Sequence, residues 1–398
     1  MTALSERSRI LLVAATTGYQ TRMFAEAAER SGVDLVLATD RCHVLDDPWG
    51  DHALAIKFDD PVLDYAGRLD GIIAVGDKPA FVAAQLAANR GLRFHSPDAV
   101  AASRNKFLAR ERFRDAGLPV PEFYRIPVSE QPSGARFYPC VLKPLGLSAS
   151  RGVIRANDDN EFAAAFRRIR ALLEREELND AIQVERFIAG REFALEGVMD
   201  GGRLEAIALF DKPDPLDGPF FEETIYVTPS REPESIQAAI FETAERAVQA
   251  LGLSDGPIHA EMRVNKEGVW MLEVAARPIG GLCAKAIPGL EEFLLRRAAG
   301  ESVPPPTPPS ASGVMMIPIP REGVYVETSG VENAAAVPGI TEVIITAKQG
   351  HKIVPLPEGA SYLGFIFARA NTPAEVEQAL RSAHRKLQFE ILGALPVL

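Results

Sequence analysis

The stretch that decides the fold is Ile258-His259-Ala260-Glu261, followed by Leu272-Glu273-Val274-Ala275-Ala276-Arg277-Pro278. Residues 258–264 alternate between apolar and polar side chains, and residues 269–274 are almost wholly apolar. Both segments are therefore predicted to be adjacent buried strands. Between them, Asn265-Lys266-Glu267-Gly268 is typical of a hairpin turn. The pattern places two carboxylates and an arginine on neighbouring strands.

A glutamate inside such a strand is costly unless it has a partner. Because Glu261 and Glu273 would face and repel each other, a divalent cation between them is the usual remedy. Arg277 could then hold a phosphate or a carboxylate with its planar guanidinium. The alternative is a structural Glu–Arg ion pair that closes the edge of the sheet. The hairpin alone leaves both interpretations open.

Further upstream, residues 139–144 form a short apolar run that includes Lys143. The small-residue segment 145–153 follows, and such a loop can present backbone N–H groups to phosphates beside a lysine. It is not a Walker A loop, because no G-K-[ST] follows its glycines. Residues 182–193 then predict a strand, a bend at Ala189-Gly190, and a second strand that begins on a carboxylate.

The order of these pieces resembles the ATP-grasp superfamily of carboxylate–amine ligases, over roughly residues 100–300. The elements that carry the resemblance are the helix-opening Lys106, the strand residue Lys143 with its glycine-containing loop, the hinge strand V-E-R-F-I-A-G-R-E, and H-x-E…E-V-A-A-R-P. Ala275 stands where many members have a metal-binding Asn. The E-x-A-x-R-P form is similar to a subgroup that includes the L-amino acid ligases, which join two amino acids.

The resemblance implies a role for each motif residue. The implied phosphate contacts of ATP are Lys106, Lys143, Ser148, Ala149, Ser150 and Gly152. The implied adenine contacts are Glu185, Arg186, Phe187 and Ile188, and Glu192 would accept the ribose hydroxyls. Glu261 and Glu273 would bind Mg²⁺ (or Mn²⁺). Arg277, Gly280 and Gly281 would act on the transferred phosphate and the reacting carboxylate.

Some of these residues have competing interpretations. His259 alternates with Glu261, so it could orient a carboxylate, contact substrate, or be a satisfied core histidine. Lys212 and Glu223 lie in or near the proline-rich segment 211–221, which is predicted to be a substrate loop or a surface connector. Glu192 could instead form an ion pair with Arg191 or another basic group, and Lys106 could be a solvated helix-start lysine.

The bulk composition is that of a globular protein of several domains: 398 residues, 47% hydrophobic and 24% charged. A net charge of −11 argues against nucleic acid as the main partner. The cysteines Cys42, Cys140 and Cys283 have no metal-ligand spacing, and Cys140 is predicted to pack as a small hydrophobe. The apolar run at residues 10–15 is too short to cross a membrane, so a cytoplasmic location is expected.

The expected architecture is a multidomain α/β and α+β protein. Residues 1–100 alternate strands (9–15, 34–38, 70–75) with helices, which predicts a doubly wound parallel sheet. No G-x-G-x-x-G follows the first strand, so a dinucleotide site is excluded, and Gly18 is interpreted as a turn glycine. Residues 99–116 are predicted to be one helix. The resemblance assigns residues 101–302 to the ATP-grasp domain, with an α+β lid at about 120–185. The proline-rich stretch 304–309 marks the start of a small α+β domain at 303–398.

The predicted function is an ATP-dependent ligase that forms an amide between a carboxylate, expected to be an amino acid, and an amine through an acyl phosphate, releasing ADP and phosphate. The alternatives are a purine-pathway or carboxylase-type relative, and a non-catalytic nucleotide-binding protein that keeps the fold. Related ligases are often dimers, which leaves a homodimer open by analogy.

Overall fold

The N-terminal part of the computed structural model is a parallel sheet covered on both faces. The structure describes residues 7–15, 20–40, 53–178, 180–308, 310–359 and 361–393. The sheet order is β3-β2-β1-β4 and every pairing is parallel. Its elements are β1 (Arg9–Ala14), α1 (Thr21–Ser31), β2 (Asp34–Thr39), β3 (Leu54–Ala55), β4 (Gly71–Val75) and α2 (Asp77–Arg90). The predicted doubly wound sheet is confirmed, while Gly18 and Cys42 lie outside the described residues.

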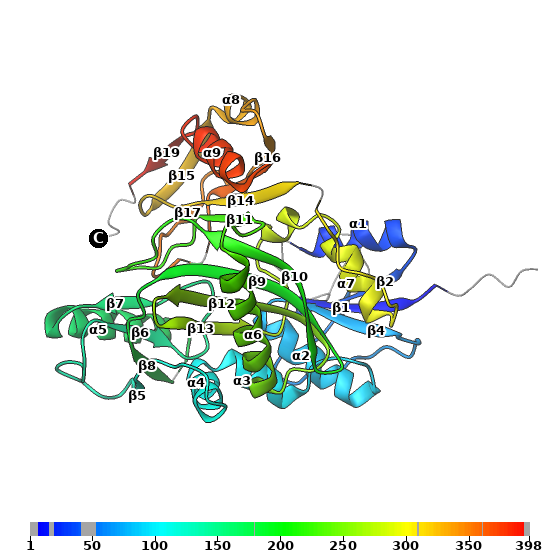
Figure 1. The fold of residues 1–398 in the computed structure, drawn as a ribbon, viewed down its shortest axis with the longest axis horizontal. Helices are drawn as coiled ribbons and strands as arrows, with labels where there is room; N and C mark the ends of the chain where they lie inside the picture. The colour runs from blue at the N-terminus through cyan, green and yellow to red at the C-terminus, as the bar shows by residue number, and fades with distance from the viewer. Residues whose placement is uncertain are drawn as a thin grey trace, which may run out of the picture.

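Alternating side chains of β1 explain why both faces are covered. Leu11 and Val13 pack with residues of α2, whereas Ile10 and Leu12 pack with Phe24 of α1. The second face also receives α7 (Leu290–Ala298), which comes much later in the chain. Figure 1 shows α1 and α7 side by side, with α2 on the other side of the sheet.

The prediction of a single helix at residues 99–116 is wrong, because the helix is interrupted at Asn105. α3 (Pro97–Arg104) ends there, and α4 (Lys106–Asp115) begins immediately afterwards. The backbone of Asn105 is extended, and its side-chain oxygen accepts the N–H groups of Phe107 and Leu108 at 3.1 and 3.0 Å. This is an N-cap, which starts a new helix and fixes the direction of Lys106.

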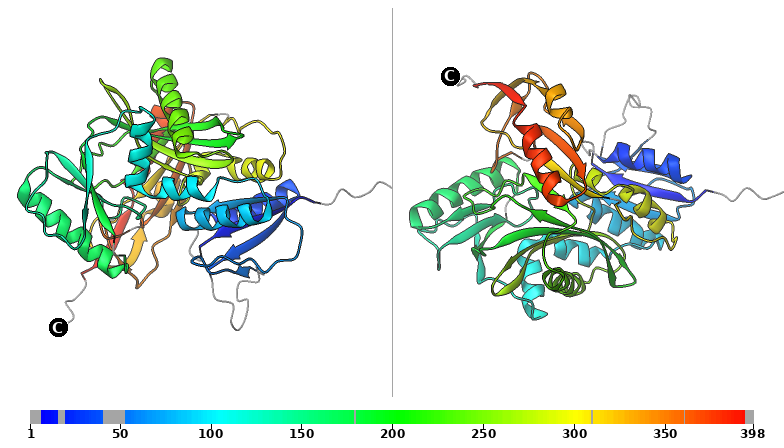
Figure 2. Two further views of the ribbon diagram at one scale, coloured as in Figure 1. Left: turned by 90° about the horizontal axis from the view of Figure 1, so that it is seen from below. Right: turned by 45° about the horizontal axis from the view of Figure 1, so that its top comes forward.

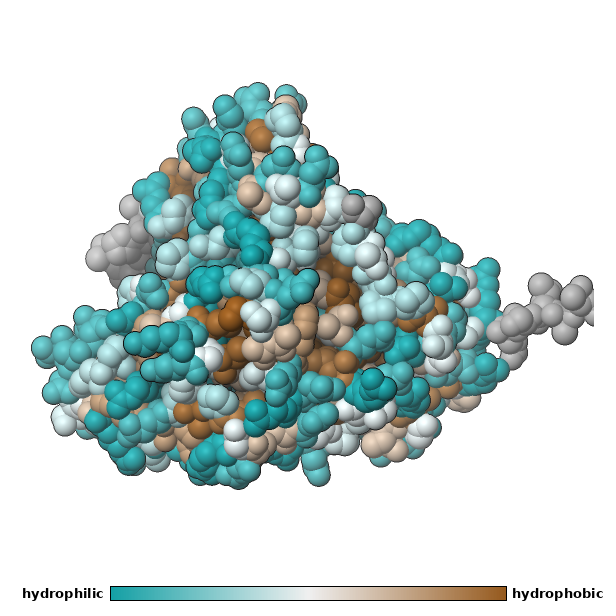
Figure 3. All heavy atoms as spheres, in the orientation of Figure 1, coloured by the Kyte–Doolittle hydropathy of each residue, from teal (hydrophilic) through white to brown (hydrophobic). Residues whose placement is uncertain are grey.

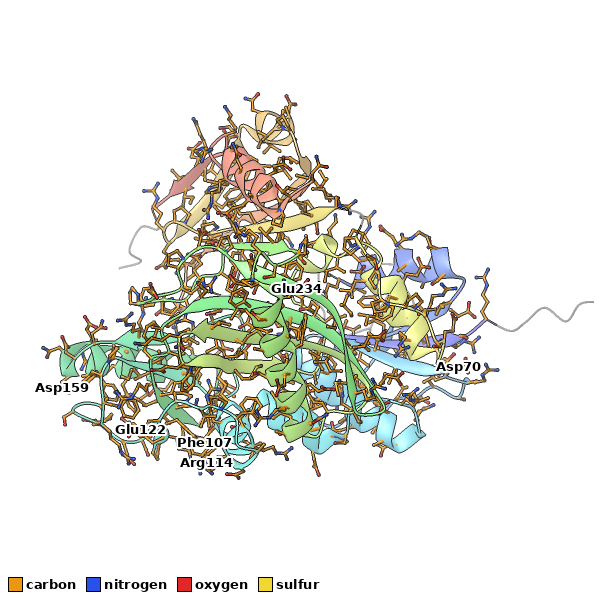
Figure 4. All side chains as sticks on the ribbon, in the orientation of Figure 1. Asp70, Phe107, Arg114, Glu122, Asp159 and Glu234 are labelled. Carbon is orange, nitrogen blue, oxygen red and sulfur yellow. The ribbon has the colours of Figure 1, made fainter. Side chains whose placement is uncertain are left out.

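The lid, residues 123–186, is a four-stranded antiparallel sheet in the order β5-β8-β6-β7 with one helix packed on it. Its elements are β5 (Phe123–Pro127), β6 (Cys140–Pro144), β7 (Ile154–Ala156), α5 (Asp159–Arg175) and β8 (Ala181–Arg186). Cys140 is fully buried in this core, as predicted. Figure 4 places Phe107 and Arg114 of α4 near Glu122, where α4 meets the lid through the ring of Phe123.

An eight-stranded antiparallel sheet joins the centre of the molecule to its C-terminal part, in the order β13-β12-β9-β10-β11-β14-β18-β16. Its strands and the helices between them are β9 (Arg191–Asp200), β10 (Arg203–Lys212), β11 (Ile225–Thr228), α6 (Glu234–Leu251), β12 (Gly256–Asn265), β13 (Gly268–Ala275), η1 (Cys283–Ala286), β14 (Ala311–Ile317), β16 (Ile340–Ile345) and β18 (Gly364–Ala370). The hairpin predicted at 258–274 is β12–β13, and its turn closes on the pair Asn265–Gly268.

The C-terminal strands do not form a wholly separate sheet. β14, β16 and β18 extend the large sheet across the predicted boundary at residue 303. A smaller sheet, β17-β15-β19, and two helices complete this part: β15 (Gly323–Ser329), α8 (Val331–Ala335), β17 (Lys352–Ile353), α9 (Pro373–His384) and β19 (Gln388–Leu392). Figure 2 shows the lid, the N-terminal sheet and the C-terminal part arranged around the central strands.

The face of the molecule seen in Figure 3 is mostly polar. Hydrophilic residues dominate on that face, and apolar residues gather near the middle. Among the described residues, none of the helices is long and apolar enough to cross a lipid bilayer.

Candidate active site

A cavity of about 360 Å³ lies where the N-terminal sheet, the lid, the large sheet and the C-terminal strands meet. Most residues singled out from the sequence line it. These are Lys106, Lys143, Ser148, Ser150, Glu185, Phe187, Ile188, Glu192, Glu223, His259, Glu261, Glu273, Arg277, Gly280 and Gly281. Gly152, Arg186 and Lys212 do not line it. The cavity therefore collects side chains from segments that are far apart in the sequence.

The two carboxylates of the hairpin face each other, as their spacing predicts. Glu261 on β12 is the direct partner of Glu273 on β13, next to a bulge in β12. The side chain of Glu273 is 35% exposed, and its carboxylate lies 3.9 Å from the Lys106 ammonium. In the part of the chain that the structure describes, Arg277 forms no ion pair with either glutamate. The purely structural Glu–Arg pair is thus absent.

Arg277 instead binds a carboxylate of the N-terminal part. Its Nε and Nη2 donate to Asp77 Oδ1 and Oδ2 at 2.8 and 3.3 Å. Burial raises the pKa of Asp77, but the attraction of Arg277 and Lys106 outweighs it, so that pKa lies below its usual value. Asp77 begins α2 directly after β4, so the carboxyl end of the parallel sheet reaches into the cavity.

Lys143 belongs to a cluster of buried charged side chains at the cavity wall. The Lys143 ammonium pairs with Glu185, and Arg110 of α4 donates Nε to Glu185 Oε2 at 2.9 Å and Nη2 to Oε1 at 3.3 Å. Burial raises the pKa of Glu185, but Arg110 and Lys143 lower it to about 2. Desolvation lowers the pKa of Lys143, and Glu185 offsets part of that effect. Lys143 is thereby held at the cavity wall by a fixed carboxylate.

The lid loop lies over the same wall. Lys106 Nζ donates to the carbonyl of Leu147 at 2.5 Å, and Ala149 and Ser150 both have left-handed backbone, with φ of 56° and 55°. Ser148 and Ser150, which are predicted phosphate contacts, line the cavity. Gly152 does not line it, and its N–H donates to the Pro357 carbonyl at 2.9 Å.

The hinge after β8 supplies an aromatic wall. Phe187 lines the cavity, stacks on Phe221 with ring centroids 6.4 Å apart, and lies under Arg263 at 5.1 Å. Its backbone N–H is already donated to the Pro139 carbonyl at 3.0 Å, so this donor is not free for adenine. Arg186, a predicted adenine contact, does not line the cavity, and its exposed side chain pairs with Glu122 at 3.1 Å.

Lys212 is the centre of a buried network rather than a substrate contact. β10 extends to Lys212, which places its ammonium 2.9, 2.5 and 2.8 Å from oxygens of Glu192, Glu223 and Glu261. Those carboxylate oxygens lie within 4.8 Å of one another, a spacing that suits a metal ion, but Lys212 already bridges them. The substrate role predicted for Lys212 is therefore corrected to that of a counter-charge.

Glu192 and Glu223 take different places in this network. Glu192 pairs with Lys212 and with Arg263 Nε at 2.8 Å, and not with Arg191, which pairs with Glu232 at the surface. Burial and the neighbouring Glu261 raise the pKa of Glu223 to about 7, although Lys212 opposes the shift. Glu223 is thus the carboxylate of the network that is least satisfied by cations.

His259 lies between two carboxylates, which favours the orienting role among its three interpretations. Its Nδ1 contacts Glu196, and its Nε2 lies 3.2 Å from Glu261 Oε1. Burial lowers the pKa of His259, but Glu196 and Glu261 raise it to about 10. Burial also raises the pKa of Glu261, but Lys212 and His259 hold it well below its usual value. Glu261 is therefore a fixed anion.

Comparison with known proteins agrees with this geometry. Residues 136–286 match the ATP-grasp domain family, and residues 315–391 match the L-amino acid ligase C-terminal domain 2. Residues 136–286 are thus similar to the ATP-grasp domain. The resemblance and the fold class predicted from the sequence are both confirmed.

Individual relatives match over somewhat less than half of the chain. The D-alanine--D-alanine ligase of Syntrophotalea carbinolica is 30% identical over 178 residues, which cover 42% of this chain and 50% of that protein. The alanine--anticapsin ligase of Bacillus subtilis is 28% identical over 212 residues, covering 48% of this chain and 44% of that one. The chain thus spans about half the length of these two relatives.

A solved structure is similar over nearly the whole fold. The L-amino acid ligase from Bacillus licheniformis has a TM-score of 0.83, with 24% identity, and the comparison covers 98% of this chain and 100% of that one. The fold of this chain is therefore shared with that structure.

Sequence reasoning missed several residues of the site. Glu196 lies inside the apolar strand 191–200, and the criterion that singled out Glu261 would have found it. Asp77 had a weaker signal, because it follows the carboxyl end of a predicted parallel strand, where such sheets present functional groups. Arg263 also had a signal, because it continues the alternation of His259 and Glu261 along the same predicted strand. Arg110 had none, since an arginine on an amphipathic helix is usually solvated.

Proposed function

We propose that this protein is an ATP-dependent ligase that joins the carboxylate of an amino acid to an amine through an acyl phosphate. ADP and phosphate would be the other products. The observation that carries the proposal is the convergence on one cavity of two lysines, the facing pair Glu261–Glu273 and Arg277. The similarity to ligases named for amino-acid substrates supports the substrate class.

The first step needs charge neutralisation and alignment. A carboxylate oxygen of the donor attacks the γ-phosphorus of ATP, and the bond to the β-phosphate oxygen breaks, so that ADP leaves. Lys106, Lys143 and Arg277 would hold the phosphate oxygens, because each lies at the cavity wall with its position fixed by a neighbour. Such preorganised cations are the main contribution that a protein makes to phosphoryl transfer.

The second step forms the amide. The neutral amine attacks the carbonyl carbon of the acyl phosphate, and the C–N bond forms. Phosphate leaves with the C–O electron pair, and the nitrogen gives up one proton to the departing phosphate or to solvent. The backbone of Gly280 and Gly281 lies at the cavity wall near Arg277, where it would approach the reacting carbonyl without side-chain obstruction. Exclusion of water by the lid would protect the acyl phosphate from hydrolysis.

The carboxylates also fit a divalent cation. Glu273 is partly exposed in the cavity and has only a long contact with Lys106, so its oxygens are available to a hard ion. Glu261 is a fixed anion directly across the hairpin. Glu261 and Glu273 would therefore hold Mg²⁺, which would neutralise charge on the phosphates. Ala275, in place of Asn, adds no ligand.

The test is phosphate release in the presence of ATP and Mg²⁺, with amino acids supplied singly and in pairs, and mass spectrometry of the products. The proposal expects ADP, phosphate and a new amide mass that depend on two substrates. Nucleotide binding without turnover in any pool would overturn it and favour a non-catalytic nucleotide-binding protein.

A further inference from the structure

The lining of the cavity has two chemically different parts. One part, which includes Lys106, Lys143 and Glu185, carries the charged groups proposed to hold ATP. The other part is formed by residues that follow Pro278 in the chain. These are Ile279 and Cys283, Met316 of β14, and Ser361, Tyr362 and Phe365 beside or on β18, together with Gly280 and Gly281. In the described part of the chain, none of the lining residues after Pro278 carries a charge.

Contacts between these side chains show that they form one wall. The rings of Tyr362 and Phe365 lie 6.1 Å apart, and Phe365 stacks on Phe367. A Cβ placed on Gly281 would lie 3.4 Å from the ring of Phe365, so the glycine turn borders the same wall. Cys283 is buried, and its thiol pKa is raised by burial and by Glu223. It behaves as an apolar group.

One acidic group borders this wall. Glu223 lines the same cavity as Tyr362 and Met316. Burial raises the pKa of Tyr362 well above its usual value, and Glu223 adds to that shift. The N–H of Met316 donates to the carbonyl of Thr224 at 2.7 Å, so the strand that carries Met316 lies against the segment that carries Glu223. A ligand between them would meet apolar surface on one side and a carboxylate on the other.

We propose that this uncharged part of the cavity selects an amino acid with an apolar side chain. That side chain packs against Met316, Tyr362 and Phe365, while the α-ammonium group of the amino acid faces Glu223. The inference rests on the proposed ligase function and names the substrate class of that site. An apolar wall contributes affinity in proportion to the apolar area that it covers. A charged side chain would lose its hydration there without gaining a partner.

Matched amino acids test the selection directly. Phosphate release is measured with ATP and Mg²⁺ for Met against Glu and Lys, and for Leu against Asp, each with the same amine partner. We expect kcat/KM for Met and Leu to exceed that for the charged analogues by at least about 100-fold. Equal or higher turnover with Glu, Asp or Lys would overturn the inference and leave the ligase function standing. No turnover with any amino acid would overturn both.

Neighbouring methionines on β14 provide a matched pair of variants. Met316→Ala removes part of the wall, so kcat/KM for Met and Leu should fall about 10-fold or more, while that for Ala changes little. Met315→Ala is the control, because Met315 lies in the separate core beneath α9 and does not line the cavity. An equal loss of kcat/KM in Met316→Ala and Met315→Ala would contradict the assignment. So would an equal loss of kcat/KM in Met316→Ala with alanine and with methionine as the substrate. The wild-type substrate profile decides the question if either variant fails to fold.

Discussion

Arg110→Met should destabilise the protein strongly although it changes one side chain on a helix. The Arg110 side chain is only 2% exposed, and its Nη1 also donates to the Met271 carbonyl at 2.6 Å. It therefore ties α4 to Glu185 of the lid and to β13 of the large sheet. The side chain of Glu185 is 3% exposed. Without Arg110, its carboxylate keeps the Lys143 ammonium and the Gln183 amide as partners.

The expected cost follows from that geometry. Breaking a buried ion pair by removing one partner typically costs about 3–5 kcal/mol, since the remaining charge stays desolvated. Lys143 offsets part of this, so we expect a loss of about 3 kcal/mol in the free energy of unfolding. Replacing both partners, as in Arg110→Met with Glu185→Leu, removes the stranded charge and should recover at least half of the loss.

Urea denaturation followed by circular dichroism measures both variants. Arg112→Met is the control, because Arg112 lies on the same helix and donates to the Leu251 carbonyl at 2.6 Å without a charged partner. That variant should lose about 1 kcal/mol. A loss below about 1 kcal/mol for Arg110→Met, or a double variant no more stable than the single one, would refute the argument that Arg110 compensates a buried charge.

Three further variants test the site, and one pH experiment tests a buried histidine that does not line the cavity. Glu273→Gln should abolish Mg²⁺-dependent phosphate release while the melting temperature stays unchanged; near-normal turnover would remove Glu273 from the metal site. Asp77→Asn should lower kcat/KM about 10- to 100-fold, because Arg277 loses a charged acceptor worth about 1.5–3 kcal/mol; unchanged kinetics would show that Arg277 needs no such support. Lys143→Ala should weaken ATP binding measured by calorimetry, and an unchanged affinity would place the lysine outside the site. His95 is buried, its Nδ1 accepts the N–H groups of Ser254 and Asp255 at 3.3 Å, and burial lowers its pKa to about 4. This folded-state pKa lies below the unfolded value of about 6.5, so the neutral ring stabilises the fold at pH 7. The free energy of unfolding should therefore fall by about 2 kcal/mol between pH 7 and pH 5. In urea titrations, His95→Gln should lose this part of the pH dependence.

The local elements could be predicted because their signals are local. The alternation at 258–264 and the two-residue turn fix the register of β12 and β13, which is why Glu261 and Glu273 face each other. The predicted strands of the N-terminal sheet and the lid also agree with the structure, because each follows from a short apolar run in the local sequence. The break at Asn105 was missed, since a helix pattern continues on both sides and only the extended backbone of one residue divides it.

The sequence by itself determined the ordered motifs, the facing carboxylates and the lysine before a small-residue loop. Only the tertiary structure decided which charges pair. Arg277 pairs with Asp77 across 200 positions, Arg110 pairs with Glu185 across 75, and Lys212 contacts three carboxylates from two strands and a loop. The physical reason is that a buried charge must be neutralised by whichever opposite charge the packed elements bring within a few ångströms, and no local pattern specifies that neighbour.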